Sequence, residues 1–395
     1  MTFSPHEALV QPNLPSLSRV LTSAAAVLKV PGFQNELQLP AARSVCVALV
    51  DGLGSAQLKR ALAHMPFLRT VLADPAADRR SLQSAFPSTT TASLASLGTG
   101  LESGLHGMVG YEVLDPDRDT VINLLGDWDP AVNPLRWQPY PTVFEQLQGK
   151  VRTVTVSLPR FKDSPLTRAV LRGSEFLAAT TPQARVRVAA ETLASREPTL
   201  LYWYWSEVDK AGHRYGVDSP QWEHQVAELD GALRSLSAQL PPDTLLLLTA
   251  DHGMVDVAPE HRYDFSTDPA LVAGVRHTAG EPRLRQLYLE PDADAEALVQ
   301  AWRKAWGHQA WILQRDEAIE AGFYGEMRPE VLPRIGQVLV AAREPVAFYD
   351  MRSSPARALE LVGQHGSLTK AERVVPLIRI PTGKSPGRAS ASRRR

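Results

Sequence analysis

Five acidic and imidazole side chains follow the ends of three strongly apolar segments. They are Asp51, Asp209, His213, Asp251 and His252. The segments that precede them are 44–50 (SVCVALV), 199–205 (TLLYWYW) and 244–249 (TLLLLT). Carboxylates and neutral imidazoles without a thiolate suit zinc or a similar divalent ion. The pattern therefore predicts a metal site, provided that the three segments end at the same edge of the fold.

Each of these residues also has a simpler interpretation. An Asp-Gly pair after a strand, as at Asp51, is a common turn, and His252-Gly253 allows the same interpretation. Asp209 and His213 are spaced as a surface pair on a helix, which is worth only a few tenths of a kcal/mol. Their coincidence at several strand ends favours the metal site.

The three apolar segments are typical of strands that are buried on both faces of a parallel sheet. Weaker strand candidates lie at 151–156 and 337–342, and helical patterns occur between the strands. The expected helices are 55–62, 182–194 and 221–240. This alternation predicts an α/β fold with a mostly parallel central sheet and right-handed crossovers. Ligands then bind beyond the carboxyl ends of the strands.

The composition of the sequence and the pattern of expected elements change along the chain, which suggests a division into domains. We expect an N-terminal extension at 1–40 with one helix at 16–28, a catalytic domain at 41–269 and 335–381, a cap or insertion lobe at 270–334, and a disordered basic tail at 382–395. Within the insertion lobe, a β-α-β unit is expected from strands at 285–289 and 310–313 and a helix at 293–306.

Composition excludes several classes of partner. The net charge of -1 gives no reason to expect nucleic acid or an anionic membrane. The single cysteine, Cys46, excludes an intramolecular disulfide and a thiolate-only metal site. Because neither a signal peptide nor an apolar run of about 20 residues is visible, a cytoplasmic location is expected. The sequence does not indicate an oligomeric state.

A cluster of hydroxyls at 86–100 (FPSTTTASLASLGTG) offers candidate nucleophiles. Pro87 is expected to precede a short helix that ends at Gly98 and begins near 88–90. Backbone N–H groups of its first turn would face an anionic phosphoryl group. A hydroxyl bound to a divalent cation can lose its proton there and attack phosphorus. Ser88 and Thr89 are interpreted as helix caps.

The ordered motifs resemble the nucleotide pyrophosphatase/phosphodiesterase family of the alkaline phosphatase superfamily. The resemblance extends from Ser44 to Leu377. Its motifs are Asp51, Pro87–Thr90 through Thr99-Gly100, His106-Gly107, Asp209 with His213, Asp251-His252-Gly253, and His365-Gly366. It implies an alkaline-phosphatase-like fold with helices on both faces of the sheet. It also implies that Thr90 is the nucleophile, three residues after Pro87 and nine before Thr99.

The resemblance further implies two divalent metal ions, expected to be Zn²⁺. One ion would be held by Asp51, Thr90, Asp251 and His252, and the other by Asp209, His213 and His365. The implied reaction passes through a phosphothreonine intermediate, which water then hydrolyses. His106 is expected to shape its loop rather than to bind a metal.

One departure from the family pattern concerns the phosphate-binding residues. Many members carry an asparagine three residues after the nucleophile, where this chain has Ser93. Phosphate binding would then depend on the backbone N–H of Thr91 with help from Ser93. Tyr111, Trp128 and Phe161 are candidates for stacking on a nucleotide base, although core packing explains each of them as well.

The favoured function is hydrolysis of phosphodiester or pyrophosphate bonds in a small phosphate ester or nucleotide. A phosphomonoesterase or phosphonate hydrolase of the same superfamily is the nearest alternative, although no arginine can be assigned as a clamp for a dianion and only Arg160 and Arg168 are left open. A non-catalytic metal-dependent ligand-binding protein is a second alternative. The sulfatase branch is not favoured, because its C/S-x-P-x-R motif is not visible.

Overall fold

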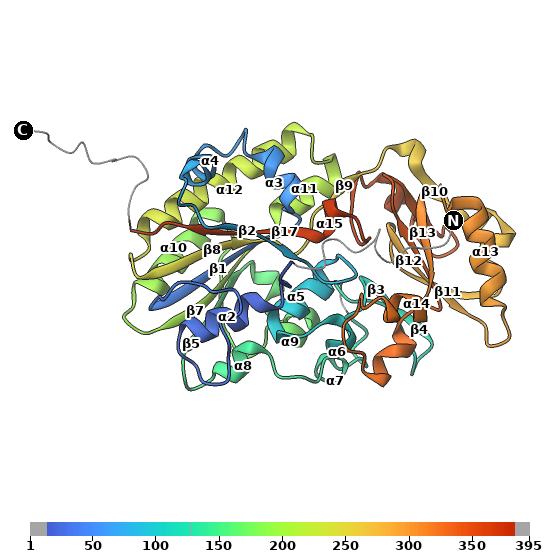
Figure 1. Cartoon of the computed structure of the whole chain (residues 1–395), viewed down its shortest axis with the longest axis horizontal. Helices are drawn as coiled ribbons and strands as arrows, with labels where there is room; N and C mark the ends of the chain where they lie inside the picture. Colours follow the sequence, from blue (N-terminus) through green and yellow to red (C-terminus); the bar gives the residue numbers. More distant parts are fainter. Residues whose placement is uncertain (1–13, 127, 384–395) are drawn as a thin grey trace, which may run out of the picture.

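The computed structural model describes residues 14–126 and 128–383, which form two lobes (Figure 1). The main lobe is built on a seven-stranded sheet with the order β2-β17-β8-β1-β7-β5-β6. Its strands are β1 (Ser44–Val50), β2 (Arg79–Gln83), β5 (Arg152–Ser157), β6 (Glu175–Ala178), β7 (Thr199–Trp205), β8 (Thr244–Thr249) and β17 (Val374–Ile380). β1 pairs in parallel with β7 and β8, and β5 pairs in parallel with β6 and β7. Only β17, among these strands, runs antiparallel to its two neighbours, β8 and β2.

The predicted central strands are confirmed. Every residue of β1, β7 and β8 is buried, which accounts for their uninterrupted apolar sequences. The predicted helices are confirmed to within about two residues, a normal uncertainty at helix ends. They correspond to α3 (Ser55–Ala61), α10 (Pro182–Ala194) and α12 (Pro220–Gln239). The expected α/β class with a mostly parallel sheet is therefore correct.

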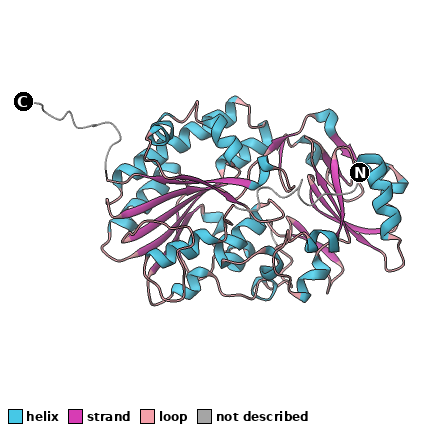
Figure 2. Cartoon of the chain, in the orientation of Figure 1, coloured by secondary structure: helices cyan, strands magenta, loops and turns pink. Residues whose placement is uncertain are grey.

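Helices cover both faces of the main sheet (Figures 1 and 2). One face carries α3, α10 and α12 together with α4 (Pro66–Ala73) and α11 (Glu207–Tyr215); the other carries α2 (Arg19–Val27), α5 (Thr90–Thr99), α8 (Val143–Leu147) and α9 (Pro165–Val170). The helix expected at 16–28 is α2, whose Val20 and Leu21 are fully buried in the main core. The described part of the N-terminal extension is thus packed into the main lobe.

The second lobe contains a four-stranded antiparallel sheet with its own apolar core. Its strands, in the order β11-β12-β14-β13, are β11 (Val275–Glu281), β12 (Leu284–Leu289), β13 (Ala310–Gln314) and β14 (Val338–Ala342). The expected β-α-β unit is present as β12, α13 (Ala295–Trp306) and β13. The strand expected at 337–342 is β14, which lies between β12 and β13 although its residues fall in the range assigned to the catalytic domain. An apolar run predicts a buried strand but not the sheet to which it belongs.

Short elements complete the described chain. They are α6 (Ser103–His106), β3 (Glu112–Asp115), β4 (Thr120–Asn123), α7 (Pro134–Trp137), β9 (Val255–Asp256), β10 (Arg262–Asp264), α14 (Arg315–Glu320), β15 (Ala347–Tyr349), β16 (Gly363–Gln364) and α15 (Lys370–Arg373). Of the expected disordered tail, residues 384–395 lie outside the described ranges, as do residues 1–13 of the expected extension. Within those ranges, none of the helices is both long enough and apolar enough to cross a bilayer.

Candidate active site

The three central strands bring their following residues to one edge of the sheet. β1 lies between β7 and β8, with Val50 opposite Trp205 and Leu49 opposite Thr249. Asp51 and Asp251 therefore leave the sheet side by side at its carboxyl edge. Asp209 lies in the first turn of α11, directly after β7. The predicted convergence is observed for the described residues.

The first group of site residues surrounds the Nε2 atom of His252. This atom lies 3.3 Å from Oδ1 of Asp51 and 3.7 Å from Oδ2 of Asp251. The hydroxyl of Thr90 lies 3.2 Å from the same Nε2 and 3.5 Å from Oδ1 of Asp51. The other ring nitrogen of His252, Nδ1, donates to the carbonyl oxygen of Gly253 at 3.0 Å, which turns Nε2 toward the site.

The second group lies next to the first. Nε2 of His213 is 3.4 Å from Oδ1 of Asp209. The ring of His365 stacks on that of His252, with 3.7 Å between the ring centroids, and lies 5.1 Å from that of His213. Nδ1 of His213 donates to the Gly363 carbonyl at 2.7 Å, and Nδ1 of His365 to the Ser88 carbonyl at 2.8 Å. Both imidazoles thus carry a backbone partner on one nitrogen, as metal ligands usually do.

These side chains form two sets whose ligand atoms lie within 4.8 Å of one another. The sets are Asp209, His213 and His365, and Asp51, Asp209 and His252. Asp209 belongs to both sets, so its carboxylate stands between the two candidate metal positions. Asp251 lies beside the second set, where its Oδ1 accepts hydrogen bonds from the backbone N–H groups of Gly52 and His252.

The charges of the site fit bound cations. Burial and the neighbouring Asp51 carboxylate raise the pKa of both Asp209 and Asp251 well above the usual range. Burial would lower the pKa of His252, but Asp251 and Asp51 outweigh it and raise that pKa to about 10. Oδ1 of Asp209 and Oδ2 of Asp251 are buried and accept no hydrogen bond from the described residues. A divalent cation would satisfy these oxygens and offset the repulsion between the carboxylates.

Thr90 occupies the first position of α5, whose N-cap is Thr89. The helix does not end at Gly98 as expected but continues to Thr99, followed by Gly100 in the left-handed region at a φ of 75°. A Cβ atom on Gly98 would lie 1.9 Å from the carbonyl oxygen of Val170. Gly98 therefore permits close packing against α9 and does not mark a helix end.

The hydroxyls beside Thr90 have roles different from those expected. Ser88 does not cap α5: its hydroxyl donates to the Ser367 carbonyl at 2.7 Å and accepts from the Gly366 N–H at 3.2 Å. Thr89 holds the N-cap position, but its side chain makes no cap hydrogen bond. The cap interpretation is therefore wrong for Ser88, whose partners come from a segment far away in the sequence, whereas Thr89 is the N-cap by position but without a side-chain cap bond.

Of the predicted substrate-binding residues, Thr91 and Ser93 are buried in α5, and Tyr111, just before β3, is half-buried. The Thr91 hydroxyl donates to the Gly110 carbonyl at 2.7 Å, which leaves its backbone N–H as the group able to face a ligand. The Ser93 hydroxyl is buried without a partner among the described residues. The Tyr111 N–H donates to Oε1 of Glu281 at 2.7 Å. A substrate contact by any of them stays a prediction.

His106 has the structural role expected of it. Its Nε2 lies 3.0 Å from the Ser96 hydroxyl, and its Nδ1 accepts from the Met108 N–H at 3.1 Å. Burial lowers its pKa to about 3, so the ring is neutral and both nitrogens are occupied.

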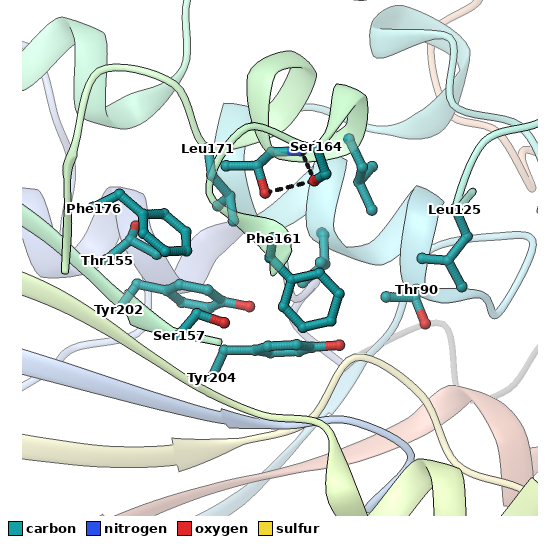
Figure 3. A pocket seen from close by; sticks show the side chains of 13 residues that line it. Thr90, Leu125, Thr155, Ser157, Phe161, Ser164, Leu171, Phe176, Tyr202 and Tyr204 are labelled. Atoms are coloured by element: carbon teal, nitrogen blue, oxygen red, sulfur yellow. Dashed lines mark hydrogen bonds between the residues drawn. The ribbon is translucent and has the colours of Figure 1, made fainter. Parts of the chain in front are cut away.

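A pocket opens beside Thr90 and is lined mainly by aromatic and aliphatic side chains (Figure 3). Phe161 projects into it toward Tyr204, with ring centroids 5.7 Å apart in an edge-to-face arrangement. In Figure 3, Leu125 lies at the same end of the pocket as Thr90. Of the aromatic residues considered from the sequence, Phe161 lines this pocket, whereas Trp128 is buried against Trp137.

Tyr204 was not among the predicted site residues, yet its hydroxyl donates a short hydrogen bond to Oδ2 of Asp51. In the sequence, the only indication is its position in β7. Residues two apart in a strand lie on the same face, so Tyr202 and Tyr204 share one face close to the strand end. A tyrosine in an apolar strand is usually a packing residue, so this signal was too weak.

Loss of the Tyr204 hydroxyl is expected to weaken metal binding. Tyr204→Phe should reduce the affinity for the divalent ion at Asp51 about tenfold, because a ligating carboxylate loses the donor that orients it. Zn²⁺ titration by competition with a chelator measures this. Tyr202→Phe is the matched control, because the Tyr202 hydroxyl has no partner among the described residues. Equal affinities in the two variants would contradict the orienting role.

The fold, together with a threonine hydroxyl beside two sets of carboxylate and imidazole side chains, defines an α/β protein of the alkaline phosphatase type. The family model for type I phosphodiesterase / nucleotide pyrophosphatase matches residues 45–368. Because this is more than half of the 395 residues, the chain belongs to that family. The expected enzyme class, a hydrolase of phosphoric ester bonds, is the class that this family defines.

Two human relatives match parts of the chain. Ectonucleotide pyrophosphatase/phosphodiesterase family member 5 is 26% identical over 171 residues, which is 42% of this chain and 35% of that protein. The catalytic subunit of GPI ethanolamine phosphate transferase 3 is 33% identical over 63 residues, which is 16% of this chain and 6% of that protein. The matched parts therefore cover about a third or less of these relatives.

Solved structures share the fold over most of their length. Murine ectonucleotide pyrophosphatase / phosphodiesterase 5 has a TM-score of 0.67 at 19% identity, covering 85% of this chain and 87% of its own. The same murine protein is known as an inactive threonine-to-alanine variant in complex with AMP. Phosphonoacetate hydrolase from Sinorhizobium meliloti 1021, in complex with phosphonoacetate, has a TM-score of 0.66 at 19% identity, covering 87% and 92% of the two chains.

Proposed function

We propose that this chain is a metal-dependent phosphodiesterase or nucleotide pyrophosphatase that works through a phosphothreonine intermediate on Thr90. The observation that carries the proposal is the position of the Thr90 hydroxyl. It lies at the start of α5, 3.2 Å from Nε2 of His252, and at the edge of an apolar pocket. Family membership supports the reaction class, and the inactive threonine-to-alanine variant of the murine relative supports a threonine nucleophile.

The chain's own residues account for the two displacements as follows. The Thr90 hydroxyl loses its proton, its oxygen forms a bond to phosphorus, and the bond from phosphorus to the leaving oxygen breaks. The leaving group then takes up a proton. Water cleaves the new Thr90–phosphorus bond in the second displacement and restores the hydroxyl. First-turn N–H groups of α5, including that of Thr91, face the phosphoryl oxygens, because they have no carbonyl partner inside the helix.

The proposed metal content is two zinc ions held by the two sets of carboxylates and imidazoles. Divalent ions bound there would stabilise negative charge on the attacking and leaving oxygens. Asp51, Asp251 and His252 are proposed for the ion next to Thr90. His213 and His365 are proposed for the other ion, and the Asp209 carboxylate stands between the two.

We further propose that the leaving group binds in the pocket of Figure 3, against Phe161 and Tyr204. Phe161→Ala is expected to raise KM for a substrate with an aromatic leaving group about tenfold, because an aromatic contact of about 1 kcal/mol is lost together with apolar burial. KM for a methyl diester, which does not reach the ring, should stay the same. Tyr111→Phe serves as the control, since Tyr111 is another aromatic residue that the sequence predicts to contact the substrate. A similar rise of KM for both substrates would place the leaving group elsewhere.

A comparison of substrates tests the function itself. Metal-loaded protein should hydrolyse an aryl phosphodiester and a nucleotide pyrophosphate faster than an aryl phosphate monoester. A strong preference for the monoester would favour a phosphomonoesterase instead. Turnover of phosphonoacetate alone would favour a phosphonate hydrolase, the alternative supported by the fold of the Sinorhizobium meliloti enzyme. Ligand binding without turnover of any substrate would indicate a binding protein.

The cytoplasmic location and the absence of nucleic-acid and membrane partners stay predictions from the sequence. For the domains, we propose that the second lobe includes β14, because that strand pairs with β12 and β13.

A further inference from the structure

A buried ion pair joins the second lobe to the main lobe at the turn between β11 and β12. Glu281 pairs with Leu284 in this hairpin, so Pro282 and Arg283 form its two-residue turn. Arg283 and Glu372 of α15 are both fully buried. Nε of Arg283 donates to Oε1 of Glu372 at 2.8 Å, and Nη2 donates to Oε2 at 2.9 Å. Two parallel hydrogen bonds of this kind fix both the distance and the orientation of the two side chains.

The Arg283 guanidinium is also held by its own lobe. Nη1 donates to the carbonyl oxygens of Glu344 at 2.8 Å and Val346 at 3.0 Å. A buried ion pair of this kind often adds no net stability over two apolar side chains of similar volume, because both charges must first leave water. Stability alone is therefore a weak explanation for the pair, and its other hydrogen bonds indicate a further role.

The Glu372 carboxylate also binds the loop that carries His365. Its Oε1 accepts the Ser367 N–H at 3.0 Å, and its Oε2 accepts the Thr369 hydroxyl. Ser367 lies two residues after His365, and its own hydroxyl donates to the carbonyl of Ala342, the last residue of β14, at 2.6 Å. This loop is therefore held between α15 and the sheet of the second lobe.

The backbone of α15 holds the turn after His252 in a similar way. The Glu372 carbonyl accepts the Gly253 N–H at 2.7 Å, and the Gly253 carbonyl accepts Nδ1–H of His252 at 3.0 Å. A Cβ atom on Gly253 would lie 1.9 Å from the Ala371 carbonyl oxygen, so a glycine is needed for this approach. One residue, Glu372, thus contacts the segments of two candidate metal ligands, but only the segment of His365 depends on its side chain.

We propose that Arg283 and Glu372 are positioning residues for the metal ion proposed at His213 and His365. Through Arg283, the second lobe holds the Glu372 carboxylate in place. That carboxylate in turn holds the loop from which the His365 ring faces that of His213, with 5.1 Å between the ring centroids. The inference rests on the two-ion site of the proposed function. The second lobe would then control the occupancy of one ion without supplying a ligand to it.

Two double variants separate this role from stability. Arg283→Met alone leaves a buried carboxylate without its cation, so it should destabilise the metal-free protein. Arg283→Met with Glu372→Met removes both charges, and Arg283→Met with Glu372→Gln does the same but keeps an oxygen that can accept the Ser367 N–H. Urea unfolding of metal-free protein should show that both double variants recover most of the lost stability.

The affinity for Zn²⁺, measured by competition with a chelator, should distinguish the two double variants. With Glu372→Met, one of the two ions should bind about tenfold or more weakly than in the wild type, because an outer partner of a metal ligand is lost. The other ion should keep its affinity. With Glu372→Gln, both affinities should lie close to those of the wild type, because the acceptor for the Ser367 N–H remains.

Asp230→Asn is the control for a general loss of stability. Asp230 is buried, and its carboxylate accepts the N–H groups of Phe67 and Leu68 in α4, each at 2.8 Å. This variant should unfold at a lower urea concentration and still bind both ions as the wild type does.

The proposal is overturned if the two double variants bind zinc equally well, or if zinc affinity simply follows stability across all the variants. A wild type that binds fewer than two ions would overturn it as well. Neither measurement uses a phosphate ester. A wild type that binds two ions but hydrolyses no phosphodiester would therefore contradict the proposed reaction and leave the role of Arg283 and Glu372 to be decided by the zinc titrations.

Discussion

Thr90→Ala is expected to abolish hydrolysis of an aryl phosphodiester, with a loss in kcat on the order of 10³-fold or more, as is typical when a catalytic nucleophile is removed. The variant should still bind metal, because the carboxylates and imidazoles around Thr90 remain. KM should change much less than kcat, since the pocket against Phe161 is intact. Stopped assays with metal-loaded protein measure both constants. If the wild type is denatured during turnover, mass spectrometry should find phosphate on the peptide that contains Thr90.

Thr99→Ala is the matched control for this substitution. Thr99 ends the same helix, is similarly buried, and donates its hydroxyl to the Ala95 carbonyl at 2.7 Å. Its loss should cost about 1 kcal/mol of stability and leave kcat unchanged. Thr90→Ser should retain part of the activity, because a hydroxyl remains in place. Full activity in Thr90→Ala would show that another hydroxyl or water is the nucleophile.

Removal of the divalent ions is expected to have the second large effect. Chelation should abolish hydrolysis and lower the midpoint of thermal unfolding, because an ion that binds only the folded state at 100 times its Kd stabilises that state by about 2.7 kcal/mol. The unfolding midpoint should fall for a second reason as well. Asp51 and Asp251 are buried and Asp209 is partly buried beside them, and without a cation their negative charges repel one another. Addition of Zn²⁺ should restore both activity and the midpoint, with two ions per chain by elemental analysis.

Asp209→Asn tests whether the effect of metal removal comes from ions at the two candidate positions. Because the Asp209 carboxylate belongs to both ligand sets, its loss should reduce the occupancy of both ions. Loss of His365 should affect only one. Asp218→Asn, an exposed acid paired with Arg60 at the surface, is the control and should bind two ions. A wild type that is fully active with one ion per chain would rule out the two-ion site.

The sequence was a good guide to the candidate metal ligands at strand ends. Asp51, Asp251 and His252 follow β1 and β8 directly, and uninterrupted apolar segments identify such strands without any tertiary information. Asp209 and His213 share one turn of α11, so their proximity follows from helical spacing alone. These contacts are local, or follow from the rule that parallel strands end at one edge. His365 lies on no such element, and it was identified only through the order of motifs along the chain.

The same reasoning was less successful where a residue's role depends on distant partners. Ser88 looked like a helix cap, but Gly366 and Ser367 supply the partners of its hydroxyl in the folded chain. Gly98 looked like a helix end, but it is the place where α5 meets the Val170 carbonyl. Residue propensities describe the local conformation that a segment prefers in isolation, and long-range packing overrides this preference.

The sequence by itself therefore determined the α/β class, the central strands, and the carboxylates and imidazoles that meet beyond them, because each depends on periodicity or on position within one element. Only the tertiary structure decided that β14 belongs to the second sheet, that Tyr204 donates to Asp51, and that Ser88 bonds to Gly366 and Ser367. Each of these depends on which side chains from remote segments face one another. That choice is made by the packing of whole elements, for which short sequence patterns carry no signal.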